Sequence, residues 1–400
     1  MLHRVQSAYN NGGTMGKKDL QKWHLFFGVL TAGLFLLSAC GKTDVKDTDN
    51  GTLAIESVVD DCDFEYFYVA ESERGYYFWE FIDEEHPYPR LMFVDKESGQ
   101  VVPLCNKPDC THEGRECNAY YPGLDFGKDG IAKYYLQYYD ESLYALGVSA
   151  DDYVTLFRIE EDGSEWEIST KLYRTDYAGT GHWKQPEILL VDGFAYFVDW
   201  KQKVMKLERV PIGGGTAEVL FEGDSEAPEV QIYRVKSYDG TVFFQAHIFV
   251  DENIEHAAGG LYQYDVSSNQ CRMIKEGLVG PYSIRNDFVY YGNEEGLCRY
   301  SIQDESTEIL ADQPMNVPNI ILTRENIFVY DQMGDNTLTA YDYEGKEVFR
   351  VTEGLKPTRL FCGNSKIMFG ERADEIGLRQ CYLDLTHPLD ELRWEELTAD

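Results

Sequence analysis

The chain has 400 residues and a formal net charge of −34, from 70 acidic and 36 basic side chains. So acidic a surface repels nucleic acids and anionic lipid headgroups, and we therefore expect no nucleic-acid partner. Aromatic residues make up 14% of the chain and include 29 tyrosines. Aromatic side chains favour pleated, half-buried surfaces, and no long stretch after residue 53 shows helical spacing of apolar residues. The composition therefore predicts an all-β protein.

The first elements in chain order are those of an export signal. Lys17, Lys18 and Lys22 form a basic stretch, and residues 25–37 contain no charged side chain. This apolar run is too short to span a bilayer, which takes about 20 residues. Its length suits the apolar region of a secretory signal. Residues 37–41 (LSACG) follow it and resemble the lipobox of bacterial lipoproteins.

This resemblance implies that residues 1–39 are removed as a lipoprotein signal peptide and that Cys40 is acylated, for example with palmitate. It also implies a location on the outer face of a bacterial cell membrane, with the lipid on Cys40 as the anchor. Residues 1–14 do not fit the pattern, and we hypothesise that the true start is Met15. Residues 40–54 have almost no apolar side chains to bury and are expected to form a flexible tether.

A degenerate repeat occupies residues 55–400, where alternating apolar strands rich in Tyr and Phe are joined by turns of Asp, Asn or Gly. Turns that start equivalent hairpins lie at positions 192, 239, 286, 325 and 363. Their spacing is the length of a four-stranded propeller blade. Seven copies fit, so we predict a β-propeller of seven four-stranded blades, with six or eight as alternatives. Residues 55–69 could supply an outer or closing strand that completes the ring with the last blade.

The second half of the repeat is clearest at residues 156–159 (LFRI) and 207–210 (LERV). These segments resemble the blades of YWTD-like propellers, the type found in the low-density-lipoprotein receptor, and of related bacterial surface lipoproteins of unknown function. The resemblance covers most of the chain after Cys40 and implies a propeller fold. It implies no particular activity, because propellers include both enzymes and scaffolds.

An inserted loop at residues 104–122, between the first two copies, is the most distinctive segment. Cys105, Cys110, His112 and Cys117 lie in it with the spacing C-x4-C-x-H-x4-C. This spacing resembles a segment that recurs in Gram-positive surface lipoproteins of this type. Three thiolates and one imidazole so close in sequence can form a closed tetrahedral zinc site, which would organise a loop without its own core.

Two alternatives to a structural zinc ion stay open for this loop. In an oxidising exterior, two of its cysteines would form a disulfide, and Cys62 would be available to pair with the third. In a reducing setting all of them would remain free thiols. Four later cysteines lie in strand-like sequence and are expected to pack in the core: Cys271, Cys298, Cys362 and Cys381.

The sequence contains no recognisable catalytic motif. The nucleophile elbow G-x-S-x-G, the zinc-protease motif H-E-x-x-H, the P-loop and the dinucleotide fingerprint are all absent. We therefore assign no catalytic residue and predict a membrane-anchored binding module for an unknown protein, peptide or glycan. The rival prediction is a propeller hydrolase or lyase that acts on a glycan or peptide outside the cell.

Overall fold

The computed structural model describes only part of the chain. These residues are 63–64, 68–80, 89–114, 116–120, 135–149, 151–174, 188–199, 204–223, 227, 229–249, 257–278, 280–316, 318–331, 336–352, 354–373 and 378–397. The expected signal peptide, the acylated Cys40, the tether and Cys62 lie outside these residues. None of the described segments forms a helix long and apolar enough to cross a membrane.

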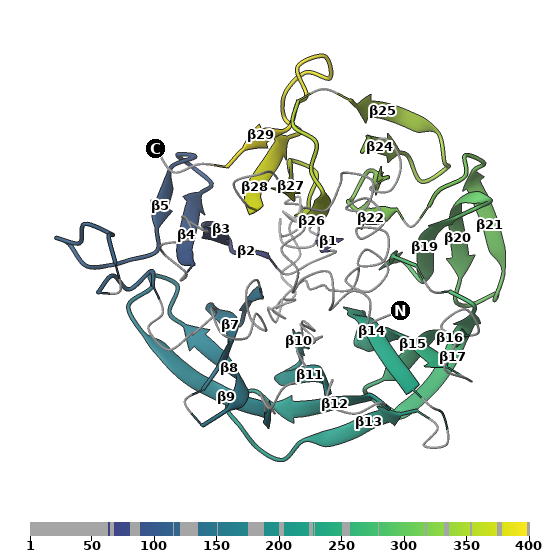
Figure 1. Cartoon of the computed structure of the whole chain (residues 1–400). Coiled ribbons are helices and arrows are strands. Elements are labelled where there is room, and N and C mark those ends of the chain that lie inside the picture. The colour runs from purple at the N-terminus through teal and green to yellow at the C-terminus, as the bar shows by residue number, and fades with distance from the viewer. Residues whose placement is uncertain are drawn as a thin grey trace, which may run out of the picture. The chain divides into compact units, whose positions relative to one another are not determined.

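Seven antiparallel sheets form the blades of a propeller, and each blade uses four consecutive strands (Figure 1). Blade 1 comprises β2 (Val69–Glu71), β3 (Gly75–Glu80), β4 (Arg90–Asp95) and β5 (Val101–Pro103), and blade 2 comprises β6 (Leu136–Tyr139), β7 (Ser142–Val148), β8 (Tyr153–Ile159) and β9 (Trp166–Arg174). Blade 3 comprises β10 (Ile188–Val191), β11 (Phe194–Asp199), β12 (Lys206–Pro211) and β13 (Glu218–Glu222), and blade 4 comprises β14 (Glu229–Tyr238), β15 (Thr241–Phe249), β16 (Ala257–Asp265) and β17 (Gln270–Glu276).

The remaining blades follow the same order. Blade 5 comprises β18 (Tyr282–Arg285), β19 (Phe288–Asn293), β20 (Gly296–Ser301) and β21 (Thr307–Ala311), and blade 6 comprises β22 (Asn319–Leu322), β23 (Ile327–Tyr330), β24 (Leu338–Tyr341) and β25 (Glu347–Val351). Blade 7 comprises β26 (Arg359–Gly363), β27 (Ile367–Ala373), β28 (Leu378–Asp384) and β29 (Glu395–Glu396). The prediction of an all-β propeller with seven four-stranded blades is confirmed.

The turns between the first two strands explain why the repeat was visible in the sequence. In blades 2 to 5 this turn has two residues, and both have positive φ angles between 46° and 79°. These turns are Asp140-Glu141, Asp192-Gly193, Asp239-Gly240 and Asn286-Asp287. Turns of this kind match the right-handed twist of the strands they join, and they favour Asp, Asn and Gly. Local turn chemistry therefore starts each of these hairpins.

A repeated arginine ties the exposed fourth strand to the third strand. Arg158, Arg209 and Arg299 occupy the third strands of blades 2, 3 and 5. The ion pairs run to the fourth strand: Arg158–Glu167 at 3.0 Å, Arg209–Glu218 at 2.8 Å and Arg299–Glu308 at 2.6 Å. The first two arginines are those of the LFRI and LERV segments, so that part of the repeat has a structural role.

Closure of the ring involves the start of the described chain. Strand β1 (Asp63–Phe64) pairs with β26 of blade 7, with Phe64 opposite Cys362. The expected pairing of residues 55–69 with the last blade is confirmed for these two residues. Of the two alternatives, the closing strand is the one observed, because β29 occupies the outer edge of the sheet and β1 lies beside the first strand.

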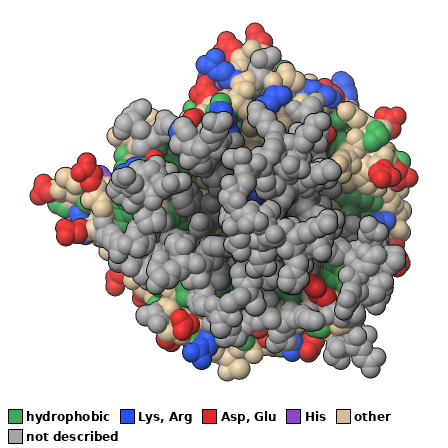
Figure 2. Space-filling model, in the orientation of Figure 1, with side chains coloured by type: hydrophobic (Ala, Val, Ile, Leu, Met, Phe, Trp, Pro, Cys, Tyr) green, Lys and Arg blue, Asp and Glu red, His purple; other side chains and the backbone are tan. Residues whose placement is uncertain are grey.

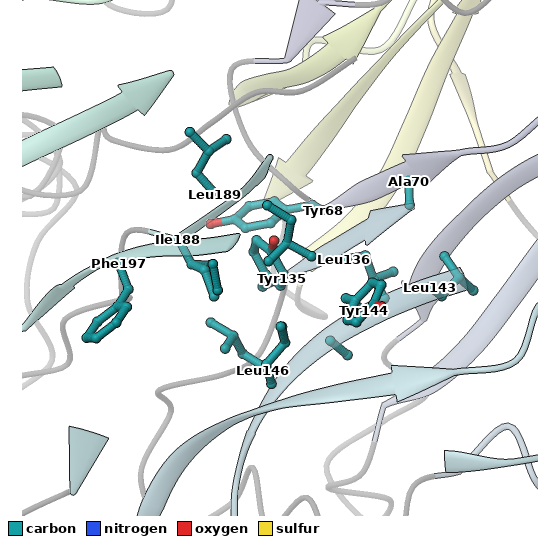
Figure 3. Packing of buried hydrophobic residues seen from close by; sticks show 14 of the residues in the cluster. Tyr68, Ala70, Tyr135, Leu136, Leu143, Tyr144, Leu146, Ile188, Leu189 and Phe197 are labelled. Atoms are coloured by element: carbon teal, nitrogen blue, oxygen red, sulfur yellow. The ribbon is translucent and has the colours of Figure 1, made fainter. Parts of the chain in front are cut away.

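Buried apolar clusters fill the spaces between neighbouring blades. One buried apolar cluster extends from blade 1 through blades 2, 3 and 4, and it also includes Phe361 and Phe369 of blade 7. Figure 3 shows part of it, where Tyr68 of blade 1, Tyr135 and Leu136 at the start of blade 2, and Leu189 of blade 3 lie close together. Burial of apolar surface between blades therefore stabilises the ring as a whole.

The described surface is rich in charge. Figure 2 shows Asp and Glu side chains at many points of this surface, with Lys and Arg among them.

The cysteines outside the loop differ in burial. Cys298, Cys362 and Cys381 are buried, as expected for core packing. Cys271 is exposed, so the expectation was wrong there, because it lies on the solvent-facing part of the fourth strand of blade 4. No two of the described cysteines form a disulfide.

Candidate metal centre

The cysteine-rich loop leaves blade 1 after β5 and lies between this strand and β6 (Figure 1). Both ends of the described loop are fastened to β4 through one residue, Leu91. The backbone N–H of Leu104 donates to the carbonyl of Leu91 (2.8 Å), and the N–H of Leu91 donates to the carbonyl of Ala119 (2.9 Å). The blade therefore fixes where the loop begins and where it returns.

The loop brings together the four predicted ligand residues. One sulfur or ring nitrogen from each of Cys105, Cys110, His112 and Cys117 can be chosen so that all four atoms lie within 4.8 Å of one another. Two thiolates bound to one zinc ion at the tetrahedral angle lie about 3.8 Å apart. Small movements of the side chains would therefore complete a tetrahedral site. No other His, Cys, Asp or Glu group in the described part of the chain converges in this way.

Tight turns between the ligands make this convergence possible. The N–H of Cys110 donates to the carbonyl of Lys107 (3.3 Å), and the N–H of Cys117 donates to the carbonyl of Gly114 (3.2 Å). His112 has a φ of 58° and Gly114 a φ of 95°. Both angles lie in the left-handed region, which glycine adopts freely and most other residues adopt mainly in turns. The chain reverses at these two residues and returns Cys117 to the other thiols.

Hydrogen bonds to sulfur favour a thiolate in the cluster. The N–H of Ala119 lies 3.3 Å from Cys117 Sγ, and His112 Nδ1 lies 3.4 Å from the same sulfur. Burial opposes ionisation of Cys105, but hydrogen bonds from the N–H groups of Lys107 and Asn118 and from the neighbouring thiols hold the pKa of Cys105 below its ordinary value. One sulfur is therefore prepared to carry negative charge.

The pKa of Cys117 is shifted in the opposite direction to that of Cys105. Burial, together with the nearby sulfurs of Cys105 and Cys110, raises the pKa of Cys117 to about 12. Three thiolates so close together repel one another unless a cation lies between them. A bound divalent cation would supply that charge and keep the coordinating thiols deprotonated. The donor set thus fits a metal ion, and its assignment to zinc stays a prediction.

The structure also shows polar supports around the cluster that sequence reasoning missed. Arg90 Nη1 donates to the carbonyl of His112 (3.5 Å), and Arg90 is itself paired with Glu80. Asn106 and Asn118 make hydrogen bonds from the loop to its surroundings. Each of these two asparagines directly follows a cysteine ligand in the sequence, and this adjacency is the signal that could have identified them.

Comparison with known proteins supports the fold. No protein-family model and no curated protein matches the sequence. A solved prolyl endopeptidase is similar with a TM-score of 0.52 and 13% identity, over 83% of this chain and 50% of that one. A puromycin hydrolase is similar with a TM-score of 0.52 and 11% identity, over 80% and 52%. A structure from a nidogen/laminin complex has a TM-score of 0.40 and 14% identity, over 67% and 91%.

These likenesses concern the architecture only. At 11–13% identity, the matches to the two enzymes show a shared fold and carry no activity with them. The chain also spans about half the length of the two enzymes.

Proposed function

We propose that this protein is a lipid-anchored, extracytoplasmic propeller that works as a binding module for a protein, peptide or glycan. The observation that supports it is the seven-bladed ring itself, whose neighbouring blades pack against one another through buried apolar clusters. Such a scaffold is rigid and presents the loops between strands at its faces, where binding residues usually lie. The described residues supply one reactive cluster, and its donor set suits a structural role.

The anchor is proposed from the lipobox-like segment that ends at Cys40. The test is expression of the full chain and of Cys40→Ala in a bacterium, followed by cell fractionation and mass measurement. We expect the wild type in the membrane fraction with the mass of an acylated Cys40, and the variant released. Cys271→Ser is the matched control, because Cys271 is an exposed cysteine far from the signal in sequence. An unmodified wild-type Cys40 would disprove the anchor.

The binding role is tested against the rival enzymatic role with the same preparation. The purified chain is applied to glycan and peptide arrays, and the ligands it retains are then incubated with it and analysed for products. Binding without a change in the ligand supports the module. Turnover of a retained glycan or peptide would contradict it and favour the hydrolase or lyase.

For the cysteine-rich loop we propose a structural zinc ion held by Cys105, Cys110, His112 and Cys117. Zinc is bound well by three thiolates and one imidazole, and four protein ligands leave no position open for a substrate. Soft thiolates also bind Cu(I) and iron–sulfur clusters, so the metal must be identified and not only counted. When bound, the ion would cross-link four points of a loop whose described residues, 104–114 and 116–120, form no strand.

Metal content and thiol count on protein purified without chelator test this site. We expect about one zinc ion per chain, retained in Cys271→Ser and lost in Cys110→Ser. Absence of metal together with two fewer reactive thiols per bridge would show a disulfide instead. Absence of metal with every thiol reactive would show free cysteines.

A further inference from the structure

The cysteine-rich loop contacts blade 2 as well as blade 1. Asn106 Nδ2 donates to Asp162 Oδ2 (3.3 Å), and Asn118 Nδ2 lies 3.5 Å from the carbonyl oxygen of Ser164. Asp162 and Ser164 belong to the turn between β8 and β9 of blade 2. The loop, which begins at the end of blade 1, therefore reaches across to the neighbouring blade.

A close backbone approach strengthens this contact. Gly163, in the middle of the same turn, is buried and has a φ of 72°. A Cβ atom at this position would lie 2.5 Å from the carbonyl oxygen of Leu104, so the turn has space only for glycine. Leu104 directly precedes the ligand Cys105. The loop backbone and the blade 2 turn therefore touch beside the cluster.

The contacts to blade 2 depend on residues covalently next to the metal ligands. Asn106 follows Cys105 and Asn118 follows Cys117. The two asparagines are also linked to each other, because Asn118 Nδ2 donates to Asn106 Oδ1 (3.1 Å). An ion that fixes the two cysteines would thus fix both asparagines, and with them the hydrogen bonds to the turn.

The loop has only a small apolar core of its own. Its buried apolar cluster consists of Cys117, Ala119 and Tyr120, with Cys105 and Cys110 packed against them. Three of these five residues are the candidate ligands. A segment with so small a core is ordered mainly by its metal, as in other small metal-bound motifs.

We propose that metal binding at this cluster clamps blade 1 to blade 2. The metal would thereby control how firmly the seam between these two blades is closed at the β8–β9 turn. This inference rests on the proposed zinc site and adds a regulatory role to it. Loss of the metal would release the turn locally, while the rest of the seam would stay joined by contacts that do not involve the loop.

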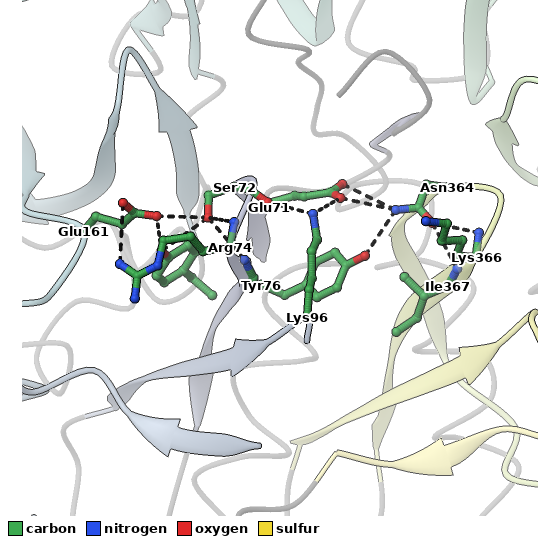
Figure 4. A network of polar contacts seen from close by, with 11 residues as sticks. Glu71, Ser72, Arg74, Tyr76, Lys96, Glu161, Asn364, Lys366 and Ile367 are labelled. Carbon is green, nitrogen blue, oxygen red and sulfur yellow. Dashed lines mark hydrogen bonds and ion pairs between the residues drawn. The ribbon is translucent and has the colours of Figure 1, made fainter. Parts of the chain in front are cut away.

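The metal-independent contacts of the seam involve Glu161 in the same turn. Its Oε1 accepts hydrogen bonds from Tyr77 Oη (3.0 Å) and Ser72 Oγ (3.1 Å), both on blade 1. Figure 4 shows Glu161 beside Ser72 and Arg74. The clamp therefore adds to an existing contact, and its removal is expected to loosen the seam without opening the ring.

Amide hydrogen exchange on the full chain, with and without zinc chloride, tests the clamp. We expect residues 160–165 to exchange roughly tenfold more slowly with zinc, which corresponds to about 1.4 kcal/mol. The equivalent turn of blade 4, residues 265–270, does not touch the loop and should not change. In Asn106→Ala/Asn118→Ala the ligands remain, so zinc should still bind and protect the loop but not residues 160–165.

The outcomes separate the clamp from the zinc site on which it rests. If the wild type binds zinc and the ion protects only the loop, the clamp is wrong and the structural zinc site stands. If the wild type binds no zinc, both are wrong. Equal protection of residues 160–165 in the double variant would also overturn the clamp, because the asparagines would then have no part in it. Cys110→Ser should show no zinc-dependent change.

Discussion

The interface between blades 7 and 1 consists of buried aromatic side chains and a side-chain hydrogen bond. The interface between blades 1 and 2 also includes an inserted loop. At the 7/1 seam, the rings of Tyr68 and Phe361 lie 4.6 Å apart and those of Tyr76 and Phe369 lie 4.9 Å apart. Asn364 of blade 7 donates to Tyr76 Oη at 3.2 Å. This seam closes the ring with side chains that are almost 300 residues apart in sequence.

The 1/2 seam has a different balance of contacts. The rings of Tyr77 and Tyr138 stack at 6.3 Å, and the carboxylate of Glu161 accepts two hydrogen bonds from blade 1. Figure 4 shows that a polar network reaches from Glu161 through blade 1 to Asn364 of blade 7. The comparison indicates that the 7/1 seam, which closes the ring, depends on the packing of aromatic side chains. The 1/2 seam also includes the contact between the cysteine-rich loop and the β8–β9 turn, which a bound metal could strengthen.

The largest expected effect is on the packing of the closure seam. Phe361 is fully buried, and Phe361→Ala should lower the free energy of unfolding by about 3–5 kcal/mol, because it leaves a cavity. Chemical denaturation measures the change. Leu389→Ala is the control, since Leu389 is 61% exposed and its truncation should have little effect. A small loss for Phe361→Ala would show that this seam does not depend on its aromatic contacts.

Metal removal should have the next largest effect, and it concerns the other seam. An ion that binds only the folded protein adds about 2.7 kcal/mol to the free energy of unfolding when its free concentration is 100 times its Kd. Denaturation in zinc-buffered solution and in chelator measures the difference. Cys110→Ser should be insensitive to zinc, and Cys271→Ser should behave as the wild type. Equal stability of the wild type in both solutions would exclude a structural metal.

A smaller effect is expected from the metal-independent part of the 1/2 seam. Glu161→Gln replaces a charged acceptor by a neutral one and should cost about 1 kcal/mol, the usual difference between such hydrogen bonds. The loss should be the same with and without zinc, because Glu161 contacts Ser72 and Tyr77 and not the loop. A loss that depends on zinc would show that the two parts of the seam are coupled.

The smallest effect is a change in titration at the same seam. Burial and the charge of Glu161 raise the pKa of Tyr138 to about 12, from an ordinary value of 10.0. Since the pKa is higher in the folded protein, this contribution to stability is complete below pH 10 and is lost as the pH rises towards 12. Glu161→Gln should lower the pKa of Tyr138, which NMR of labelled tyrosine can follow. An unchanged pKa would mean that Glu161 does not contribute to the shift, which would then come from burial and the other nearby carboxylates.

Much of the fold was predictable because its units are local. The hairpin turns at Asp192-Gly193 and Asp239-Gly240 depend on two adjacent residues with positive φ, and alternating strands follow them directly. The ligand set could be recognised for the same reason, because Cys105, Cys110, His112 and Cys117 lie within one short segment. Wherever partners are near in sequence, the pattern of residue types was sufficient.

Contacts between blades could not be predicted in this way. Nothing near Glu161 in the sequence indicates that its carboxylate meets Ser72 and Tyr77, 89 and 84 residues away. The exposure of Cys271 likewise depends on which face of an outer strand meets solvent. Such contacts depend on the combined twist and spacing of several blades, which no single segment specifies.

The sequence by itself determined the all-β propeller class, several of the turns that start its blades and the residues of the candidate metal centre, and it favoured seven blades over six or eight. These features rest on short-range chemistry. Only the tertiary structure decided that β1 lies at the inner edge of blade 7 and that Asn364 donates a hydrogen bond to blade 1. It also decided that the cysteine-rich loop contacts blade 2. These features join residues far apart in the chain. They follow from how seven blades pack into a ring.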